Sequence, residues 1–453
     1  MKVMKKFLSK NLIKLAKSLS KPLYIVGGFV RNFIISGEPS LDIDLASSVP
    51  FDELTENLKD NGFNIVAEYK RTGTVVFSDG NQKYEYTAFR TDEYKEGGLH
   101  TPDHVNFTDD IKVDAVRRDF KCNAVYYDIK EDKIVDPLLG VDDIKNKVLD
   151  TVKSPFEVFS HDGLRLMRLA RFASELNFTP KKEVLLGAKE NAFNIKEISV
   201  ERIYAELKFI LDSDRKYSFS DKRGHYNGLK ILLKIGVLDL ILPELTLGRD
   251  MRQREDYHDF DVLEHSLRCV LYAPSEIRLT ALLHDVGKPY CMKNYGKYHL
   301  HAIEGKSIAE SIIKRLKIDK KTAKKVLFGV EYHMIDLDLQ TRESKIRLFI
   351  VKNASEIDDL LKLKQADFSA CKDDLSVAPT VLKWQSIIEK MKAEKVPFSI
   401  KELNVSAKEL IELGFLDKDL GVTLNKLLEI CVLNPKVNTN EKLKATALKF
   451  LNT

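Results

Sequence analysis

Strand-like segments occur only in the first third of this 453-residue chain, and this separation constrains the fold more than any other feature. The segments are short and apolar or alternating, and they occupy 23–30, 41–45, 63–69, 74–78, 83–89 and 124–129. From about residue 155 to the C-terminus, apolar residues recur at the spacing of amphipathic helices. The sequence therefore predicts an α/β head domain built on one mixed sheet, followed by a long all-α body.

Turn signals and charge divide this chain further. Asp136, Pro137 and Gly140 close the strand region, and a dense charge run without apolar periodicity fills 249–261. We read that run as a surface connection between two helical regions. The expected parts are a head over 1–150, a helical neck over 151–250, a helical domain over 251–370 and a helical tail over 371–453.

Composition excludes several classes of protein. The chain is 44% hydrophobic and 31% charged, which suits a soluble protein with several cores. No apolar run approaches the ~20 residues of a membrane span, so no membrane insertion is expected. Five scattered cysteines without a CxxC pair indicate reduced thiols and a cytoplasmic location. The net charge of 73 − 68 = +5 identifies no partner, and the oligomeric state is left open.

Two aspartates, Asp42 and Asp44, lie two residues apart in the segment LDIDL. Strand alternation places both carboxylates on one face, while Leu41, Ile43 and Leu45 are expected to face the core. Adjacent carboxylates repel each other unless a cation lies between them, and Mg²⁺ typically takes one or two carboxylates together with substrate phosphates. The alternative is a pair of solvated strand residues.

The residues around the aspartates favour the metal site. Gly27 and Gly28 close the preceding strand, where backbone N–H groups can approach a phosphate closely. Arg31 follows three residues later and can clamp phosphate oxygens. The pattern GG-x-V-R followed by D-x-D is more specific than either part alone. Glu85, on a later strand, is either a third acid near the metal or an exposed residue.

Two further segments carry groups suited to a nucleotide. The first, RRDFKCNA, offers Arg117, Asp119 and Asn123 for phosphate and ribose, or it is a helix start with solvated charges. The second, HDGLRLMRLARF, is expected to be helical with a polar stripe that recurs every three residues: Asp162, Arg165, Arg168 and Arg171. This stripe is either a solvated face or a reader of the base, since an aspartate accepts and an arginine donates hydrogen bonds to a Watson–Crick edge.

Resemblance to a known family is carried, in order, by YIVGGFVRNFIISGEPSLDIDLAS, GTVVF, YEYTAFRTDEY, VRRDFKCNAV, DPLLG, GLRLMRLARFASELNF and finally Glu201-Arg202-Ile203 with Glu206-Leu207. Over about residues 20–215 the chain resembles the class II tRNA nucleotidyltransferases, which are CCA-adding enzymes related to bacterial poly(A) polymerases. The resemblance implies a polymerase-beta-like sheet and addition of C, C and A to a tRNA 3′ end from CTP and ATP, without a nucleic-acid template. The implied chemistry is two-metal in-line attack of an RNA 3′-hydroxyl on the α-phosphate.

The same resemblance implies a role for each matching residue. It assigns binding of Mg²⁺ to Asp42 and Asp44, and binding of the triphosphate to Gly28, Arg31 and Arg117. It places Asp119 and Asn123 by the sugar. Asp162 and Arg165 would bind the base, with Arg168 and Arg171 alongside. These residues would equally serve a poly(A) polymerase or an A-only enzyme. The chain departs from the family pattern at Asn32 (usually Asp), at His161 (usually Glu) and at GLHTP over 98–102 (usually Arg-rich).

A second constellation consists of histidines and aspartates on predicted helices: His265, His284, Asp285, His301, His333 and Asp367. The pattern resembles HD-superfamily phosphohydrolase domains over about 260–370. That resemblance assigns one metal to His265, His284, Asp285 and Asp367, while His301 and His333 match positions of a second. Imidazole and carboxylate together suit a divalent transition metal. The domain is then a second, phosphohydrolase activity or a retained scaffold. A rival of another class is a phosphohydrolase whose head only binds RNA.

Overall fold

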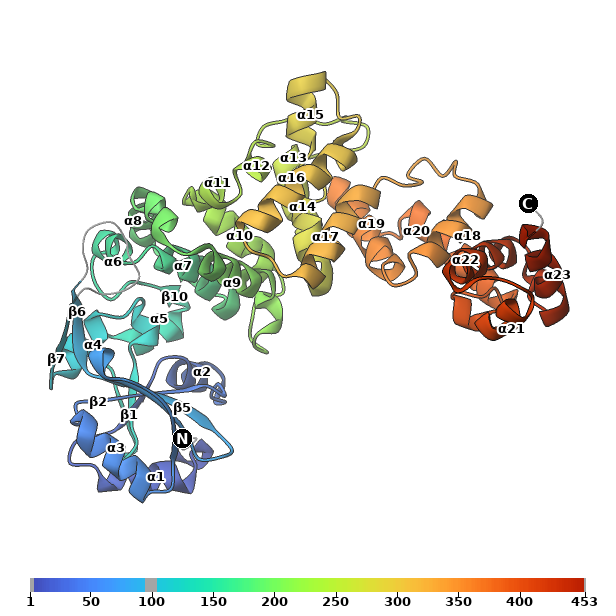
Figure 1. The fold of residues 1–453 in the computed structure, drawn as a ribbon. Helices are drawn as coiled ribbons and strands as arrows, with labels where there is room; N and C mark the ends of the chain where they lie inside the picture. Colours follow the sequence, from blue (N-terminus) through green and yellow to red (C-terminus); the bar gives the residue numbers. More distant parts are fainter. Residues whose placement is uncertain (1–3, 94–103, 452–453) are drawn as a thin grey trace. The chain divides into compact units, whose positions relative to one another are not determined.

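The structure is a computed structural model that describes residues 4–93 and 104–451 (Figure 1). The chain divides into two compact units, Met1–Pro243 and Glu244–Thr453. The predicted head and most of the predicted neck fall in the first unit. The finer division into four parts stays a prediction.

Seven strands form the main sheet of the first unit, in the order β3-β4-β5-β2-β1-β8-β9. Strands β2 and β5 are parallel neighbours, and every other neighbouring pair is antiparallel. Two short pairs, β6 with β7 and β10 with β11, lie outside this sheet. The strands are β1 Tyr24–Val26, β2 Ile43–Ser47, β3 Asn64–Tyr69, β4 Thr74–Ser78, β5 Lys83–Ala88, β6 Arg90–Glu93, β7 His104–Phe107, β8 Tyr126–Asp128, β9 Lys133–Val135, β10 Val148–Leu149 and β11 Thr179–Pro180.

Each of the six predicted segments contains a strand, and the predicted α/β head on a helical body is confirmed. The sequence did not predict β6, β7 or β9, nor the two-residue pairing of β10 with β11. One expected side-chain direction was wrong: Leu41 is 86% exposed rather than in the core. The reason is that β2 begins only at Ile43, so that Leu41 belongs to the preceding loop, whereas Ile43 and Leu45 are buried as expected.

Helices of the first unit either pack beside the sheet or follow it. Helices α1 and α3 contact each other, and α7 packs against α9 and α10. The helices are α1 Lys10–Ser18, α2 Gly28–Ser36, α3 Phe51–Asp60, α4 Ile111–Val116, α5 Gly140–Asn146, α6 Pro155–His161, α7 Leu164–Leu176, α8 Lys182–Glu190, α9 Val200–Leu211, α10 Gly224–Lys234 and α11 Val237–Ile241, with α12 Pro243–Thr246 at the division.

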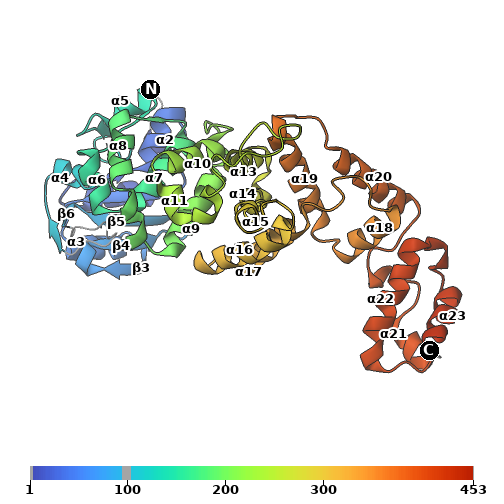
Figure 2. The same cartoon turned by 90° about the horizontal axis from the view of Figure 1, so that it is seen from above.

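The described part of the second unit is built from helices and loops (Figure 2). One apolar core around the buried Trp384 joins α18 and α20 to the last three helices. The helices are α13 Val262–Tyr272, α14 Arg278–Leu283, α15 Lys288–Tyr295, α16 His301–Arg315, α17 Lys320–Tyr332, α18 Glu343–Lys352, α19 Ile357–Lys372, α20 Pro379–Ala393, α21 Ala407–Glu412, α22 Asp417–Leu433 and α23 Asn440–Leu451.

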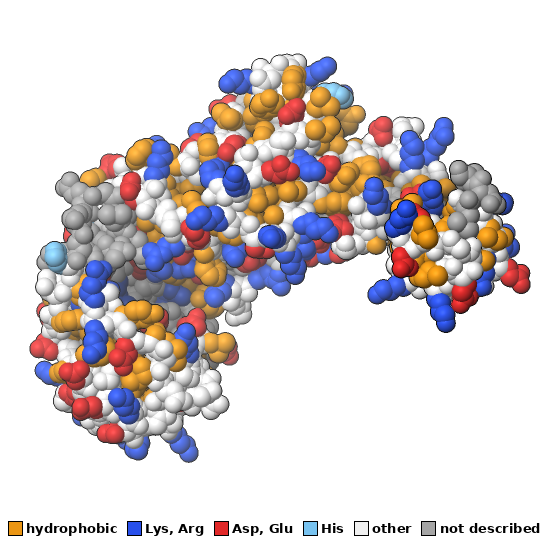
Figure 3. Space-filling view, in the orientation of Figure 1, with side chains coloured by type: hydrophobic (Ala, Val, Ile, Leu, Met, Phe, Trp, Pro, Cys, Tyr) orange, Lys and Arg blue, Asp and Glu red, His pale blue; other side chains and the backbone are white. Residues whose placement is uncertain are grey.

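Charge on the surface follows the nearly balanced composition. On the face drawn in Figure 3, basic and acidic side chains are interspersed along the chain. Within 4–93 and 104–451, no helix combines the length and the apolar character that a membrane crossing needs. Recognition of a partner must therefore be sought in local sites rather than in a global field.

Candidate functional site

A cleft of about 660 Å³ in the first unit is lined by all twelve residues that the sequence assigns to metal or nucleotide. Strand β2 and the loop before it contribute Asp44 and Asp42, the turn after β1 contributes the glycines, and α7 contributes three arginines. The twelve are Gly27, Gly28, Arg31, Asp42, Asp44, Arg117, Asp119, Asn123, Asp162, Arg165, Arg168 and Arg171. Residues up to 144 positions apart in sequence (27 to 171) thus meet in one place.

Asp42 and Asp44 line this cleft, and a third acid, Glu85, lies next to Asp44 but is exposed and outside the lining. Asp44 and Glu85 are register partners on the parallel strands β2 and β5, so their side chains leave the sheet on the same face. Burial, followed by the charge of Glu85, raises the pKa of Asp44 to about 6, with Asp42 adding to the shift and Arg118 opposing it. Clustered carboxylates of this kind fit a divalent cation, because the cation relieves their repulsion.

Binding of Mg²⁺ to these acids is expected to weaken as the pH falls through about 6, because the metal needs Asp44 ionised. Replacing Glu85 by glutamine removes the largest neighbouring negative charge, so the midpoint should move to lower pH. Calorimetric titration with Mg²⁺ from about pH 5 to about pH 8 measures both effects. A binding curve unchanged across that range would contradict the proximity of Asp44 and Glu85.

The turn after β1 requires glycine for its backbone. Gly27 has φ of +81° and ψ of −133°, a region that side chains other than glycine scarcely adopt. It ends β1 and caps α2, which begins at Gly28. A Cβ on Gly27 would lie 3.5 Å from an Asp44 carboxylate oxygen, so the turn that begins α2 lies beside this acid. Helix N-termini of this kind bind phosphate.

Arg31 is buried and fixed from two sides. Its guanidinium donates to the Asn32 side-chain oxygen, with Nη2 at 2.9 Å, and to the side-chain oxygen of Asn123. The departure at Asn32 therefore keeps an acceptor for Arg31 and removes only a negative charge. The ring of Phe172 lies beneath, with its centroid 5.3 Å from the Arg31 guanidinium carbon.

Asp114 organises the arginine pair that follows α4, and the sequence analysis did not single out this aspartate. The aspartate is fully buried; Arg117 Nε donates to one carboxylate oxygen at 2.7 Å, and Arg118 Nη2 donates to the other at 2.9 Å. The hydroxyl of Tyr126 also donates to Asp114, at 2.6 Å. Burial by itself would raise the pKa of Asp114, but the charges of Arg118 and Arg117 lower this pKa to about 2. The carboxylate thus holds both guanidinium groups in place.

Asp119 joins the sheet domain to α7. Arg168 Nε donates to Asp119 at 2.8 Å, and the side-chain amide of Asn123 donates to the other oxygen at 3.1 Å. Burial opposes ionisation, but Arg168 and Asn123 hold the pKa of Asp119 well below its usual value. The predicted sugar-binding pair therefore forms one hydrogen-bonded set with a residue of the predicted base-reading stripe.

The predicted base readers stand together at the start of α7. Asp162 accepts from the backbone N–H of Leu164 at 2.9 Å, and its carboxylate lies 3.8 Å from Arg165 Nε. Arg165 donates to two backbone carbonyls, that of Arg117 at 2.7 Å and that of Val158 at 3.2 Å. Both side chains are buried yet line the cleft, so their orientation is set before any ligand arrives.

Gly163, between these two residues, has no room for a side chain. A Cβ would lie 2.2 Å from the backbone oxygen of Asn194, which cannot move cheaply. Gly163→Ala is expected to destabilise the protein by about 1–3 kcal/mol, whereas Gly421→Ala on α22, with open space around it, should stabilise it by up to about 1 kcal/mol. Chemical denaturation of both variants checks this, and equal stabilities would contradict the packing at Gly163.

Further residues line the cleft besides the twelve with an assigned role. Phe172 lies under Arg168 and Arg171 as well as Arg31, and Arg171 in turn pairs at 3.1 Å with Glu206 on α9, which lies outside the lining. The lining also includes these side chains: Ser40, Arg90, Asp92, Arg118, Glu175, Arg202, Phe209, Lys216 and Tyr217. The segment GLHTP over 98–102 lies outside the described residues.

The second unit brings all six predicted histidines and aspartates together around Asp285. One carboxylate oxygen, Oδ2, lies 3.2 Å from His284 Nε2 and 3.5 Å from His265 Nε2. The other, Oδ1, lies 3.2 Å from His301 Nε2 and 3.5 Å from His333 Nε2. Asp367 closes the first group, 2.9 Å from His265 Nε2. The six side chains form two adjacent clusters, one of His265, His284 and Asp367 and one of Asp285, His301 and His333, and Asp285 Oδ2 also lies within 3.5 Å of both histidines of the first cluster.

The histidine tautomers fit metal ions in both clusters. His284, His301 and His333 each donate from Nδ1 to the backbone carbonyl three residues earlier, at 2.7–2.8 Å. Their Nε2 lone pairs are then left to face Asp285. The Nε2 atoms of His301 and His333 stand only 3.0 Å apart, and two lone pairs so close repel unless a cation or proton lies between them. Imidazole and carboxylate ligands suit a divalent transition metal.

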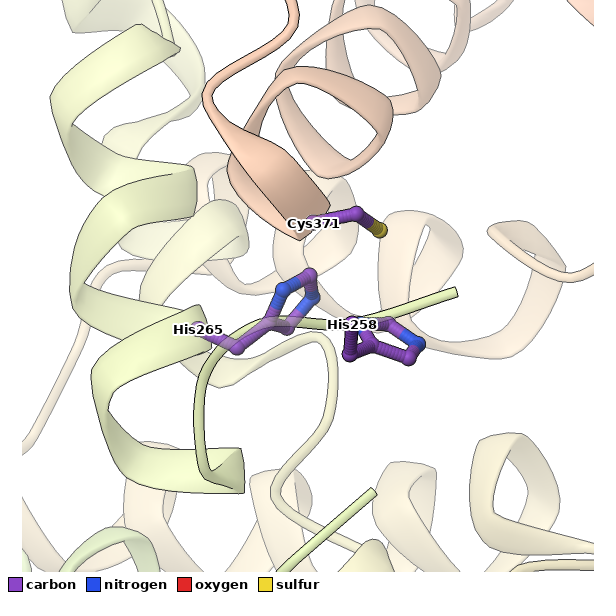
Figure 4. Close-up of side chains that lie close together, drawn as sticks. All are labelled: His258, His265 and Cys371. Carbon is purple, nitrogen blue, oxygen red and sulfur yellow. The ribbon is translucent and has the colours of Figure 1, made fainter. Parts of the chain in front are cut away.

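Residues missed by the sequence complete this centre. His258 comes from the charge run predicted to be a surface connection, and its ring packs edge-on against His265 (Figure 4). Cys371 lies one turn after Asp367 on α19, close to both histidines. Lys288 Nζ lies 2.6 Å from Asp285 Oδ2 and donates to Gln253. An adjoining cavity of about 750 Å³ is lined mostly by apolar surface and reaches Asp285, His301 and His333.

One segment of each unit matches a known sequence family. Residues 23–150 match the poly A polymerase head domain, and residues 262–360 match the HD domain. The site and the fold thus define a poly A polymerase-type head in the first unit and an HD domain in the second, which confirms the resemblance predicted from the sequence.

The similar proteins and solved structures described here are CCA-adding enzymes. The chain is 36% identical to the CCA-adding enzyme of Lactococcus lactis subsp. lactis and 34% identical to that of Streptococcus gordonii, each over 226 residues. These matches cover 49% and 50% of this chain, which spans about half the length of either relative (52%). The Bacillus stearothermophilus CCA-adding enzyme in complex with CTP shares the fold, with TM-score 0.64 and 20% identity over 98% of both chains. The Thermotoga maritima CCA-adding enzyme complexed with tRNA gives TM-score 0.58 and 17% identity, with 99% of this chain and 98% of that chain covered.

Proposed function

We propose that this chain is a tRNA 3′-end nucleotidyltransferase that adds C, C and A from CTP and ATP without a nucleic-acid template. The main support for this proposal is that Asp42 and Asp44 line the same cleft as Asp162 and Arg165, the residues expected to bind the base. The relatives support the same activity, since they are CCA-adding enzymes and the solved relatives include complexes with CTP and with tRNA.

Binding in this cleft would position the reactants for in-line attack. The N-terminus of α2, Arg31 and Arg117 surround the triphosphate, and Asp119 with Asn123 lies by the sugar. Asp42 and Asp44, with Glu85 beside them, would hold Mg²⁺ ions, which supply charge stabilisation at the attacked phosphate and lower the pKa of the attacking hydroxyl when bound. The fixed guanidinium groups need no rearrangement as charge develops on the phosphate.

Asp162 offers a physical reason for selecting C and A. Both bases carry an exocyclic amino donor where U and G carry a carbonyl acceptor. A carboxylate can accept from the amino group but repels the carbonyl, while the Arg165 guanidinium donates to the ring acceptor beside it. A protein side chain would in this way take the place of a template base.

The variant Asp162→Asn tests this function. One amide oxygen can still accept from Leu164 N–H, so the fold should survive, but the amide nitrogen now presents a donor. The preference for CTP over UTP in single-nucleotide addition should fall by about 5- to 150-fold. Asp142→Asn on the exposed face of α5 is the control and should leave the preference unchanged. An unaltered preference in Asp162→Asn would exclude Asp162 as the base reader.

A second activity is proposed for the HD unit: metal-dependent hydrolysis of a phosphate ester. The observation that favours it is the pair of His/Asp clusters beside a cavity with basic groups at Lys288 and Arg254. His284→Ala should abolish hydrolysis of phosphate monoesters or cyclic phosphodiesters and spare nucleotide transfer, whereas Asp42→Ala should do the reverse. If Asp42→Ala retained all activity on RNA, the head would only bind RNA and the rival function would hold.

A further inference from the structure

One end of the transferase cleft carries an aromatic and basic surface that neither the metal nor the nucleotide roles require. It is formed by Arg202 and Phe209 of α9 and by Lys216 and Tyr217 of the turn that follows. Phe209 is 44% exposed. We call these four residues the aromatic rim.

Cations and rings alternate along the aromatic rim. The Arg171 guanidinium carbon lies 5.3 Å from the centroid of Phe209, and Lys216 Nζ lies 6.0 Å from the same ring and 5.9 Å from that of Tyr217. Tyr217 stacks on Phe219 at 5.0 Å with 13° between the ring planes, which leaves it rigid. The ion pair of Arg171 with Glu206 fixes the guanidinium next to Phe209.

The position of the rim argues against a role in reading the incoming base. Arg171 follows Arg165 by six residues on the same helix, which corresponds to about 9 Å along the axis at 1.5 Å per residue. A base held by Asp162 and Arg165 therefore leaves the Phe209 face free. Single exposed apolar residues are common on protein surfaces, but here the exposed ring lies inside a cleft and among cations.

Transfer to an RNA 3′-hydroxyl needs the unpaired end of the RNA in the same cleft as the nucleotide. Proteins bind single strands by stacking bases on exposed aromatic rings and tracking phosphates with Lys and Arg. We propose that the aromatic rim is a stacking subsite for the unpaired 3′-terminal nucleotides of the acceptor RNA, with a base on Phe209 and phosphates beside Arg202 and Lys216. This inference rests on the function proposed above and adds a site for the second substrate.

Phe209→Ala should raise the KM for tRNA by about 5- to 150-fold and leave the KM for CTP and the kcat at saturating tRNA within about threefold. Phe209→Tyr should restore the KM because the stacking face returns. Phe193→Ala is the matched control: this ring is 64% exposed and has Lys196 Nζ 4.1 Å from its centroid, but it does not line the cleft. Unfolding temperatures of all three variants report on the fold.

Different results would contradict the stacking subsite and the proposed transfer activity. A KM for tRNA in Phe209→Ala equal to that of wild type would overturn the subsite while transfer itself stands, and so would a rise in the KM for CTP instead. Failure of the wild-type protein to extend any tRNA would instead defeat the proposed function. The affinity for tRNA falls as salt rises, and Arg202→Gln and Lys216→Gln should each make this dependence shallower. The magnitude of the slope of log affinity against log salt should decrease by about 0.7 for each variant. Unchanged slopes in both would also count against the subsite.

Discussion

Asp44→Asn is expected to reduce nucleotide transfer by roughly 10³-fold, because a catalytic cation contributes several kcal/mol to transition-state stabilisation. The amide keeps the size of the side chain but loses the charge that holds the cation. Since Asp44 stands beside Glu85 and Asp42, removal of its charge also relieves repulsion in the metal-free protein. The unfolding temperature in the presence of a chelator should therefore not fall.

Single-turnover rates with labelled CTP, together with melting curves with and without Mg²⁺, measure these effects. Wild type should gain stability from Mg²⁺, whereas Asp44→Asn should gain little. Asp60→Asn, an exposed change at the end of α3, should behave as wild type in both assays. Retention of more than about a tenth of the wild-type rate in Asp44→Asn would show that the acids of β2 are not the metal site.

Asp285→Asn is expected to destabilise the HD unit by about 3–5 kcal/mol, because Lys288 and the surrounding imidazoles lose a buried carboxylate. The same change should release bound transition metal, since the Asp285 carboxylate lies within 3.5 Å of histidines in both clusters. Hydrolysis by the second unit should be lost. Transfer by the first unit should persist wherever the variant remains folded.

Metal analysis and denaturant unfolding, each with and without a chelator, check this second variant. The chelator should lower the stability of wild type and have little effect on Asp285→Asn. Asp373→Asn breaks an ion pair with Arg268 in the same unit, but Asp373 is 42% exposed, so the cost should stay below about 1 kcal/mol. Equal metal content in Asp285→Asn and wild type would refute the shared role of the carboxylate.

Local patterns were sufficient to predict six of the seven strands of the main sheet and twelve of the residues that line the cleft of the first unit. Alternation in LDIDL placed Asp44 on one face, and the spacing of GG-x-V-R predicted the turn and arginine beside it. The partners that hold these residues were not predictable in the same way. Asp114 fixes Arg117 and Arg118 through contacts within α4 and across to Tyr126, and nothing in a single sequence separates such a buried acid from a solvated one.

Two residues of the HD centre, His258 and Cys371, could not be predicted from the periodicity of the sequence. His258 lies in a segment without apolar spacing, and only the fold brings it against His265. In the sequence, nothing distinguishes Cys371 from the other cysteines, whereas in the structure it lies on α19 one turn after Asp367 and close to His258 and His265. At the head, the departure at Asn32 proved compatible with the site because an amide oxygen still accepts from Arg31. These contacts depend on tertiary structure, which residue spacing does not encode.

CCA addition is tested most directly with three forms of one tRNA, ending at the discriminator base, at C and at CC, each offered CTP or ATP alone. We expect that CTP extends the first two forms, that ATP extends only the CC form by a single A, and that addition then stops. Incorporation of A only on the CC form, with no C on the discriminator form, would show an A-only enzyme. Long A tails on any of the three would show a poly(A) polymerase, and either result would contradict CCA addition.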